Sequence, residues 1–213
     1  MKTGKGMILA ATMVASGLFG AAATAQSLSP EEIKAMIDQR VSALNPYQEL
    51  LNDPDPARSL SAMQIMLESG DKDLTRMALE FGLLSPNPAV KRAAFESYLM
   101  SGPIISIRFD GSKVKDTDFD NRMRDDWNGN LTPERIGYWR IGVGEMLSDK
   151  KCHANTHRNF TDSCFVTVNA DGVFLTPHNM SGRGVIDDNG VLAGFATLTY
   201  VDEPVPFTIQ LLD

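Results

Sequence analysis

Apolar residues in the first half of the chain recur at intervals of three and four positions, the spacing of one face of an α-helix. The first stripe follows Ser29-Pro30-Glu31-Glu32, which has the form of a capping box. Asn45-Pro46 predicts the end of this helix, and 47–51 a further short turn. The pattern predicts about four helices, with the stripes Ile33, Met36, Ile37, Val41 and Leu44; Leu60, Met63 and Leu67; Leu74, Met77, Ala78 and Phe81; and Ala94, Phe95, Tyr98 and Leu99.

The period changes from helical to alternating at Gly102-Pro103. Ile105, Ile107 and Phe109 occupy every second position, which predicts a strand that runs into a tight turn at Asp110-Gly111. Turn signals separate the later strand-like runs, which cover 138–143, 165–168, 173–176, 185–186, 191–200 and 205–212. Strands at such short spacing favour an antiparallel meander. We therefore expect an α+β fold, with a short helical layer followed by an antiparallel β-sandwich or open barrel.

A segment of the helical half occurs twice. A shift of 32 residues lays Pro54-Asp55-Pro56-Ala57 over Pro86-Asn87-Pro88-Ala89, and it also aligns Ser69-Gly70 with Ser101-Gly102. Asp55 and Asn87 are suited to cap a first helical turn. The proline that follows each of them has no N–H group, which costs nothing there because first-turn N–H groups have no partner within the helix. The two glycines are suited to the left-handed conformation that ends a helix.

Helix pairs at this period, with proline after the cap and an alanine-rich seam, resemble HEAT-type helical repeats over about residues 54–102. The resemblance implies an extended surface for protein partners. Two copies fall short of the three that normally make such a stack stable. We therefore expect either the helix after Ser29 or the C-terminal half to cover one end. The second half contains a strand with Trp139, the two cysteines, a Val-Thr-Val run at 166–168, an Asp-Gly turn at 171–172 and an Asn-Gly hairpin at 189–190. In this pattern it resembles small exported bacterial β domains, a likeness that implies no particular function.

The first 25 residues have the features of an export signal. Lys2 and Lys5 precede an apolar run over 7–19, and Ala23-Thr24-Ala25 supplies the small residues of a cleavage site. The predicted organisation is a signal peptide at 1–25, a helical region at 26–102 and a β domain at 103–213. The expected location is the bacterial periplasm or the outside of the cell.

The net charge of the chain limits the classes of molecule that it is expected to bind. The net charge is −7, and lysine and arginine are scattered among the acidic residues. Nucleic acid is a poor partner for such a surface because its affinity comes mainly from neutralised phosphates. No later segment approaches the roughly 20 apolar residues of a membrane span, so we expect none in the mature chain.

The two cysteines, Cys152 and Cys164, are expected to form a disulfide in an oxidising compartment. Closing this loop would contribute about 3 kcal/mol by restricting the unfolded chain. His153 and His157 fall inside the loop, and with His178 they could supply the three nitrogens of a zinc or copper site. The alternative is that the histidines are exposed loop residues, with Lys150 and Arg158 making the loop locally basic.

Residues 112–130 are polar and are expected to form a long loop. Asp116, Asp118 and Asp120 alternate as in a calcium loop, but Asn121 and Trp127 stand where an EF-hand requires Gly and Glu. A solvated acidic loop and a looser calcium site are the two interpretations. Trp127, with Tyr138 and Trp139, could form a platform that stacks on sugars, although aromatic residues beside a strand are more often part of a core.

No motif for acyl transfer or phosphate binding is present in the sequence. The leading hypothesis is therefore an exported, non-enzymatic protein-interaction module without a cofactor, an accessory subunit of an envelope or membrane-bound assembly. The polar segments 112–130 and 151–164, including Asp116, Asp118, Asp120, Trp127 and Arg158, are its expected contact regions. The alternatives are a metal-binding protein or metalloenzyme that uses the three histidines, and a glycan-binding module.

Overall fold

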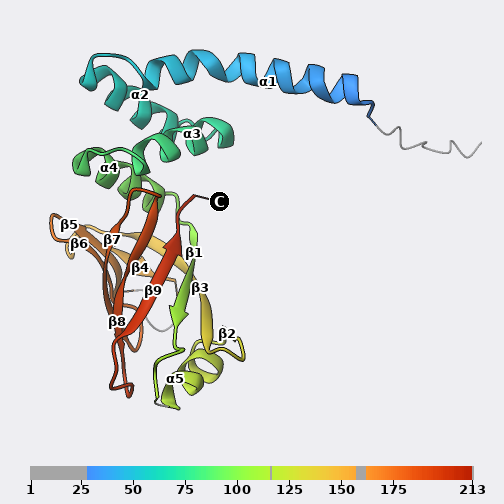
Figure 1. The fold of residues 1–213 in the computed structure, drawn as a ribbon. Helices are drawn as coiled ribbons and strands as arrows, with labels where there is room; N and C mark the ends of the chain where they lie inside the picture. The colour runs from blue at the N-terminus through green and yellow to red at the C-terminus, as the bar shows by residue number, and fades with distance from the viewer. Residues whose placement is uncertain (1–27, 116, 157–161, 213) are drawn as a thin grey trace, which may run out of the picture. The chain divides into compact units, whose positions relative to one another are not determined.

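The computed structural model describes residues 28–115, 117–156 and 162–212, so the predicted export signal lies outside the described residues. The chain divides into two compact units, Met1–Arg40 and Val41–Asp213. The described part of the first unit is the beginning of helix α1, and the second unit holds all of the other elements (Figure 1).

The elements follow the order that the hydrophobic pattern predicts, helices first and strands afterwards. The helices are α1 (Pro30–Leu51), α2 (Pro56–Glu68), α3 (Lys72–Leu83), α4 (Pro88–Met100), α5 (Asp118–Asn121) and the π-helical turn η1 (Arg122–Asp126). The strands are β1 (Ile104–Asp110), β2 (Asn130–Leu131), β3 (Ile136–Leu147), β4 (Cys152–Asn155), β5 (Cys164–Asn169), β6 (Gly172–Leu175), β7 (Met180–Ile186), β8 (Val191–Leu198) and β9 (Val205–Gln210). The α+β class is confirmed.

Helix α1 begins at the predicted capping box. The Ser29 N–H donates to the Glu32 carboxylate at 2.8 Å, and the Glu32 N–H donates to Ser29 Oγ at 3.2 Å. The predicted end at Asn45-Pro46 is wrong, because α1 continues through Pro46 to Leu51. A proline removes one backbone hydrogen bond, and the helix resumes after it, as the bond from Asn52 N–H to the Gln48 carbonyl shows.

Helices α2 and α4 have the same local chemistry, 32 residues apart. The carboxylate of Asp55 accepts from the Ala57 N–H, and the amide oxygen of Asn87 accepts from the Ala89 N–H, both at 2.9 Å. Gly70 and Gly102 follow the two helices with φ of 73° and 65°, values that favour glycine. The predicted caps and exits are confirmed.

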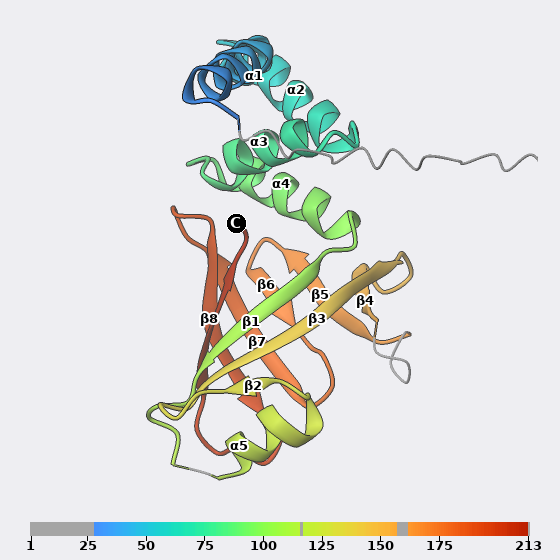
Figure 2. The same cartoon turned by 90° about the vertical axis from the view of Figure 1, so that its right-hand side faces the viewer.

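The strands close into a barrel instead of stacking as a sandwich or leaving an open edge. Eight antiparallel strands follow one another in the order β1-β9-β8-β7-β6-β5-β4-β3, and β1 also pairs with β3. Figure 2 shows β1 and β3 side by side across the barrel. Strand β1 pairs with both β3 and β9 and so joins the two ends of the meander. The contact between β1 and β9 is long-range and leaves no local signal in the sequence.

The predicted loop at 112–130 contains α5 and η1, which lie at one end of the barrel (Figure 2). Phe119, Met123 and Trp127 recur at four-residue spacing and are all buried. A cation, Arg122, is also buried, where its guanidinium donates to the Thr199 carbonyl and pairs with Asp126. The loop prediction is wrong here because a few apolar residues in a polar sequence suffice to build a short helical plug.

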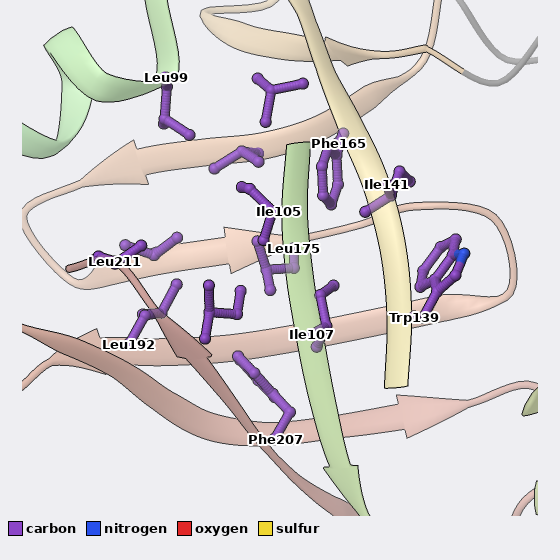
Figure 3. Packing of buried hydrophobic residues seen from close by; sticks show 14 of the residues in the cluster. Leu99, Ile105, Ile107, Trp139, Ile141, Phe165, Leu175, Leu192, Phe207 and Leu211 are labelled. Carbon is purple, nitrogen blue, oxygen red and sulfur yellow. The ribbon is translucent and has the colours of Figure 1, made fainter. Parts of the chain in front are cut away.

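The barrel core is continuous with that of the neighbouring helices. Figure 3 shows Leu99 of α4 near the same packed layer as Ile105, Phe165 and Leu175. Buried residues from α2, α3 and α4 belong to the same cluster as those of the strands.

The predicted disulfide joins Cys152 in β4 to Cys164 in β5, with 5.6 Å between the Cα atoms. None of the helices in the described ranges combines the length and apolar character that crossing a bilayer requires.

Candidate interaction surface

A groove of about 440 Å³ lies in the helical part of the second unit. It is bounded by the end of α1, the outer face of α2 and the start of α3. We call it the α1–α2 groove, and its lining residues are Tyr47, Leu50, Asp53, Ala57, Arg58, Ser61, Ala62, Ile65, Met66, Ser69 and Leu74.

The groove has exposed apolar walls and a floor of small side chains. Ile65 is 68% exposed and Leu50 is 45% exposed, although both are large hydrophobic residues. The α2 face between them carries Ala57, Ser61 and Ala62, at helical spacing. Small residues on a helix face let another helix approach its backbone closely, so the groove has the form of a helix-binding site.

A charged pair marks one end of the groove. Arg58 Nε donates to Asp53 Oδ2 at 2.8 Å, and Asp53 Oδ1 accepts from the Asp55 N–H at 2.9 Å. The backbone bond and then the guanidinium lower the pKa of Asp53. Behind the pair, Ser59 Oγ donates to the Leu51 carbonyl at 2.5 Å. These bonds hold the end of α1 and the beginning of α2 in place.

The corresponding place between α3 and α4 is closed. Gly82 of α3 aligns with Leu50 of α1 under the 32-residue shift, and Ala94 of α4 aligns with Ala62. A Cβ atom on Gly82 would lie 2.3 Å from the Ala94 Cβ. Helices α3 and α4 therefore pack directly against each other at Gly82, where there is no room for a larger side chain. In the α1–α2 pair, Leu50 and Ala62 line an open groove.

Two other hollows are lined in part by charged side chains. One, of about 420 Å³, lies between α4 and the β5–β6 hairpin; there Lys91 Nζ donates to the Asp187 carbonyl and Asp188, and Arg92 pairs with Glu96. The other, of about 580 Å³, is lined by the side chains of Lys72, Arg76 and Glu80, among other residues. The α1–α2 groove is the more apolar and is bounded by large exposed hydrophobic residues.

The acidic residues predicted as a contact or calcium site do not all meet a common centre. Asp120 accepts from Arg135 Nε at 2.8 Å, and Asp118 accepts from Asn121 Nδ2 at 3.3 Å. Both carboxylates therefore have partners within the fold. Asp116 and Arg158 lie outside the described residues.

The aromatic residues do not form an exposed sugar-stacking platform. The rings of Trp127 and Trp139 stack on each other with centroids 4.1 Å apart, and the residues are 7% and 8% exposed. Trp127 Nε1 donates to the His178 carbonyl at 3.2 Å. The rings belong to the buried core, as the core interpretation of these residues expects, and glycan binding elsewhere on the protein stays a prediction.

The three histidines have different environments as far as they are described. His153 is buried on β4, where Nδ1 lies 3.3 Å from the Gly144 carbonyl and Nε2 is buried with no hydrogen-bond partner among the described atoms. His178 is exposed between β6 and β7. His157 lies outside the described residues. Within the described ranges no three side chains of His, Cys, Asp or Glu gather to hold a metal ion, so the zinc or copper site stays a prediction.

The residues that open the α1–α2 groove were not singled out from the sequence. The signal lay in the 32-residue alignment, where Leu50 stands opposite Gly82 and Ile65 opposite Ser97. Large apolar residues in one copy of the repeat align with small or polar residues in the other.

Comparisons with protein-family models, with curated proteins and with solved structures found no match.

Proposed function

We propose that this protein is an exported, non-enzymatic interaction module that serves as an accessory subunit of a bacterial envelope assembly. The α1–α2 groove is the surface where it holds an amphipathic helix of its partner protein. The observation that carries the proposal is the pair of exposed hydrophobic residues, Leu50 and Ile65, on either side of a face of small side chains.

The chemistry of the groove favours a helix over a small polar ligand. A helix that buries apolar side chains at i, i+3 and i+4 would cover Leu50 and Ile65 and lie against Ala57 and Ala62. Each large side chain moved from water to a packed interface contributes about 1.5 to 3 kcal/mol. The Asp53–Arg58 pair at the end of the groove offers charged groups that fix the direction of the partner helix.

The architecture and the disulfide agree with this role. HEAT-like repeats present helical surfaces to other proteins, and we propose that α1 to α4 work in the same way. The bond between Cys152 and Cys164 is typical of an oxidising compartment such as the periplasm. Export is proposed from the sequence of residues 1–25.

The test is a mild affinity purification of the tagged protein from its native envelope, followed by mass spectrometry. We compare wild type with Ile65→Glu, which places a charge in the groove. Gln64→Glu is the matched control, because Gln64 is the exposed neighbour of Ile65 on α2 and is not part of the groove lining.

We expect a stoichiometric protein partner with wild type and with Gln64→Glu, and its loss with Ile65→Glu. A partner captured equally by all three proteins would contradict the groove as the binding site. A solitary protein with near-stoichiometric zinc or copper in the same eluate would contradict the interaction function and favour the metal site.

A further inference from the structure

We infer that the first half of α1 binds the same segment of a second copy of this chain, as an antiparallel helix pair. Ile33, Met36 and Ile37 are 45%, 57% and 55% exposed, and they belong to the predicted apolar stripe of this helix. Leu51 is the buried residue of α1, and the whole helix is described. A helix in water takes most of its stability from the packing of its apolar face, so this face requires a partner.

The spacing of the isoleucines fits a pair centred on Met36. Each residue advances a helix by about 1.5 Å, so in an antiparallel pair residues whose numbers add to 72 lie level with each other. Ile33 and Ile37 of one copy then alternate with those of the other along the seam, at steps of about 3 Å. The two Met36 side chains meet at the centre of the seam, and no two isoleucines lie at one height.

The charges beside the stripe are complementary in the same arrangement. Lys34 and Asp38 lie one turn apart on the same flank of the helix. Their numbers add to 72, so the Lys34 of each copy lies level with the Asp38 of the other. The pair would contain two such contacts by symmetry. A parallel pair would instead place like charges level.

A second copy fits this surface better than a membrane. Helices that lie on anionic membranes are rich in lysine and arginine on their polar face. Residues 30–40 hold three acids, Glu31, Glu32 and Asp38, and two bases, Lys34 and Arg40, for a net charge of −1. One short helix pair buries less than the roughly 1,600 Å² of a standard interface, so the expected dissociation constant is micromolar.

Sedimentation equilibrium of the purified protein over micromolar to millimolar concentration tests the pairing without any other partner. We expect a monomer–dimer equilibrium for wild type, and at least about a hundredfold weaker association for Ile37→Glu, since two charges would be buried in the seam. Far-ultraviolet circular dichroism checks that the variant keeps its fold. A monomeric wild type, or a dimer unaffected by Ile37→Glu, would overturn the inference.

A charge exchange tests the antiparallel register. Lys34→Glu and Asp38→Lys each turn two attractive contacts into repulsive ones, and each alone should weaken self-association about tenfold. An equimolar mixture of the two variants restores opposite charges at both contacts and should associate as tightly as wild type. No recovery in the mixture would show that the charges act within one helix, and would overturn the register.

This inference is independent of the proposed function, because the α1–α2 groove begins at Tyr47. If no envelope partner is captured but the protein still dimerises, the proposed function fails and this inference stands. If the partner is captured but the protein stays monomeric, this inference fails and the proposed function stands.

Discussion

The helix pairs α1–α2 and α3–α4 occupy corresponding places in the 32-residue alignment, yet they differ in how closely they pack. In the α3–α4 pair, Gly82 lets the two backbones meet, and Ala94 is fully buried. In the first pair, Leu50 replaces the glycine, and a groove remains beside Ala62. The comparison teaches that equivalent positions in two similar helix pairs can be closed by a glycine contact in one pair and left as a groove in the other.

The two pairs also differ in what covers them. The closed pair lies next to the barrel, where Lys91 of α4 donates to the Asp187 carbonyl and the core residues of α4 join those of the strands. The open pair includes the exposed Ile65. Under the proposed function, a partner protein would cover the α1–α2 pair as the barrel covers the α3–α4 pair.

The largest expected effect comes from making the closed pair resemble the open one. Gly82→Leu would place a Cβ 2.3 Å from the Ala94 Cβ and 2.8 Å from Met63 Sδ. The better helix propensity of leucine contributes about 1 kcal/mol, and the clash costs about 3 kcal/mol or more. Urea unfolding should show a net loss, whereas Leu50→Ala at the corresponding exposed place should change stability by less than about 0.5 kcal/mol. Equal effects would contradict the difference between the pairs.

The next prediction compares two neighbours on α2. Met66 is 3% exposed and belongs to the core, so Met66→Ala should lower the free energy of unfolding by about 2 to 4 kcal/mol. Ile65→Ala should lower it by less than about 0.5 kcal/mol, because its side chain faces water in the free protein. A large effect of Ile65→Ala on thermal unfolding would show that the groove is filled within the protein itself.

A smaller effect is expected at the helix caps. Asp55→Ala in the open pair and Asn87→Ala in the closed pair each remove one side-chain bond to a first-turn N–H. Each should cost about 1 kcal/mol, because both helices belong to one compact unit. A cost confined to Asn87→Ala, measured by chemical denaturation, would show that α2 unfolds separately from α4.

The smallest effect concerns pH at the end of the groove. The Asp55 N–H and Arg58 lower the pKa of Asp53 in the folded protein, so its carboxylate stabilises the fold above the unfolded value of about 3.9. That stabilisation is lost as pH falls through the lower folded-state pKa. Asp53→Asn should therefore unfold at a slightly lower temperature at pH 7, and the difference from wild type should vanish in strong acid. A difference that grows on acidification would contradict this assignment.

Local chemistry was sufficient to predict much of this fold. Asp55, Asn87, Gly70 and Gly102 mark helix ends through contacts within a few residues, and the turn signals after 170 and 188 mark hairpins in the same way. The closure of β1 onto β9 was not predictable, because those strands are separated by nearly the whole barrel.

The candidate interaction surface was equally hard to predict, because which residues are exposed depends on tertiary packing. Trp127 was named among the contact residues of a polar segment, with a core position as the alternative, and it is buried because Trp139 and Phe109 pack against it. Ile65 is a large apolar residue within a helix, as many core residues are. It is exposed because no element of the described chain covers that face of α2. Residue type and spacing alone do not distinguish these two cases.

The most direct test of the central claim is site-specific photo-crosslinking in the native envelope. A photoreactive amino acid is placed at position 65, inside the α1–α2 groove, and in a separate protein at position 64, outside it. We predict one discrete crosslinked protein species at position 65 and none at position 64. Crosslinking that is absent at both positions, or equal at both, would contradict the groove as a docking site for a partner protein.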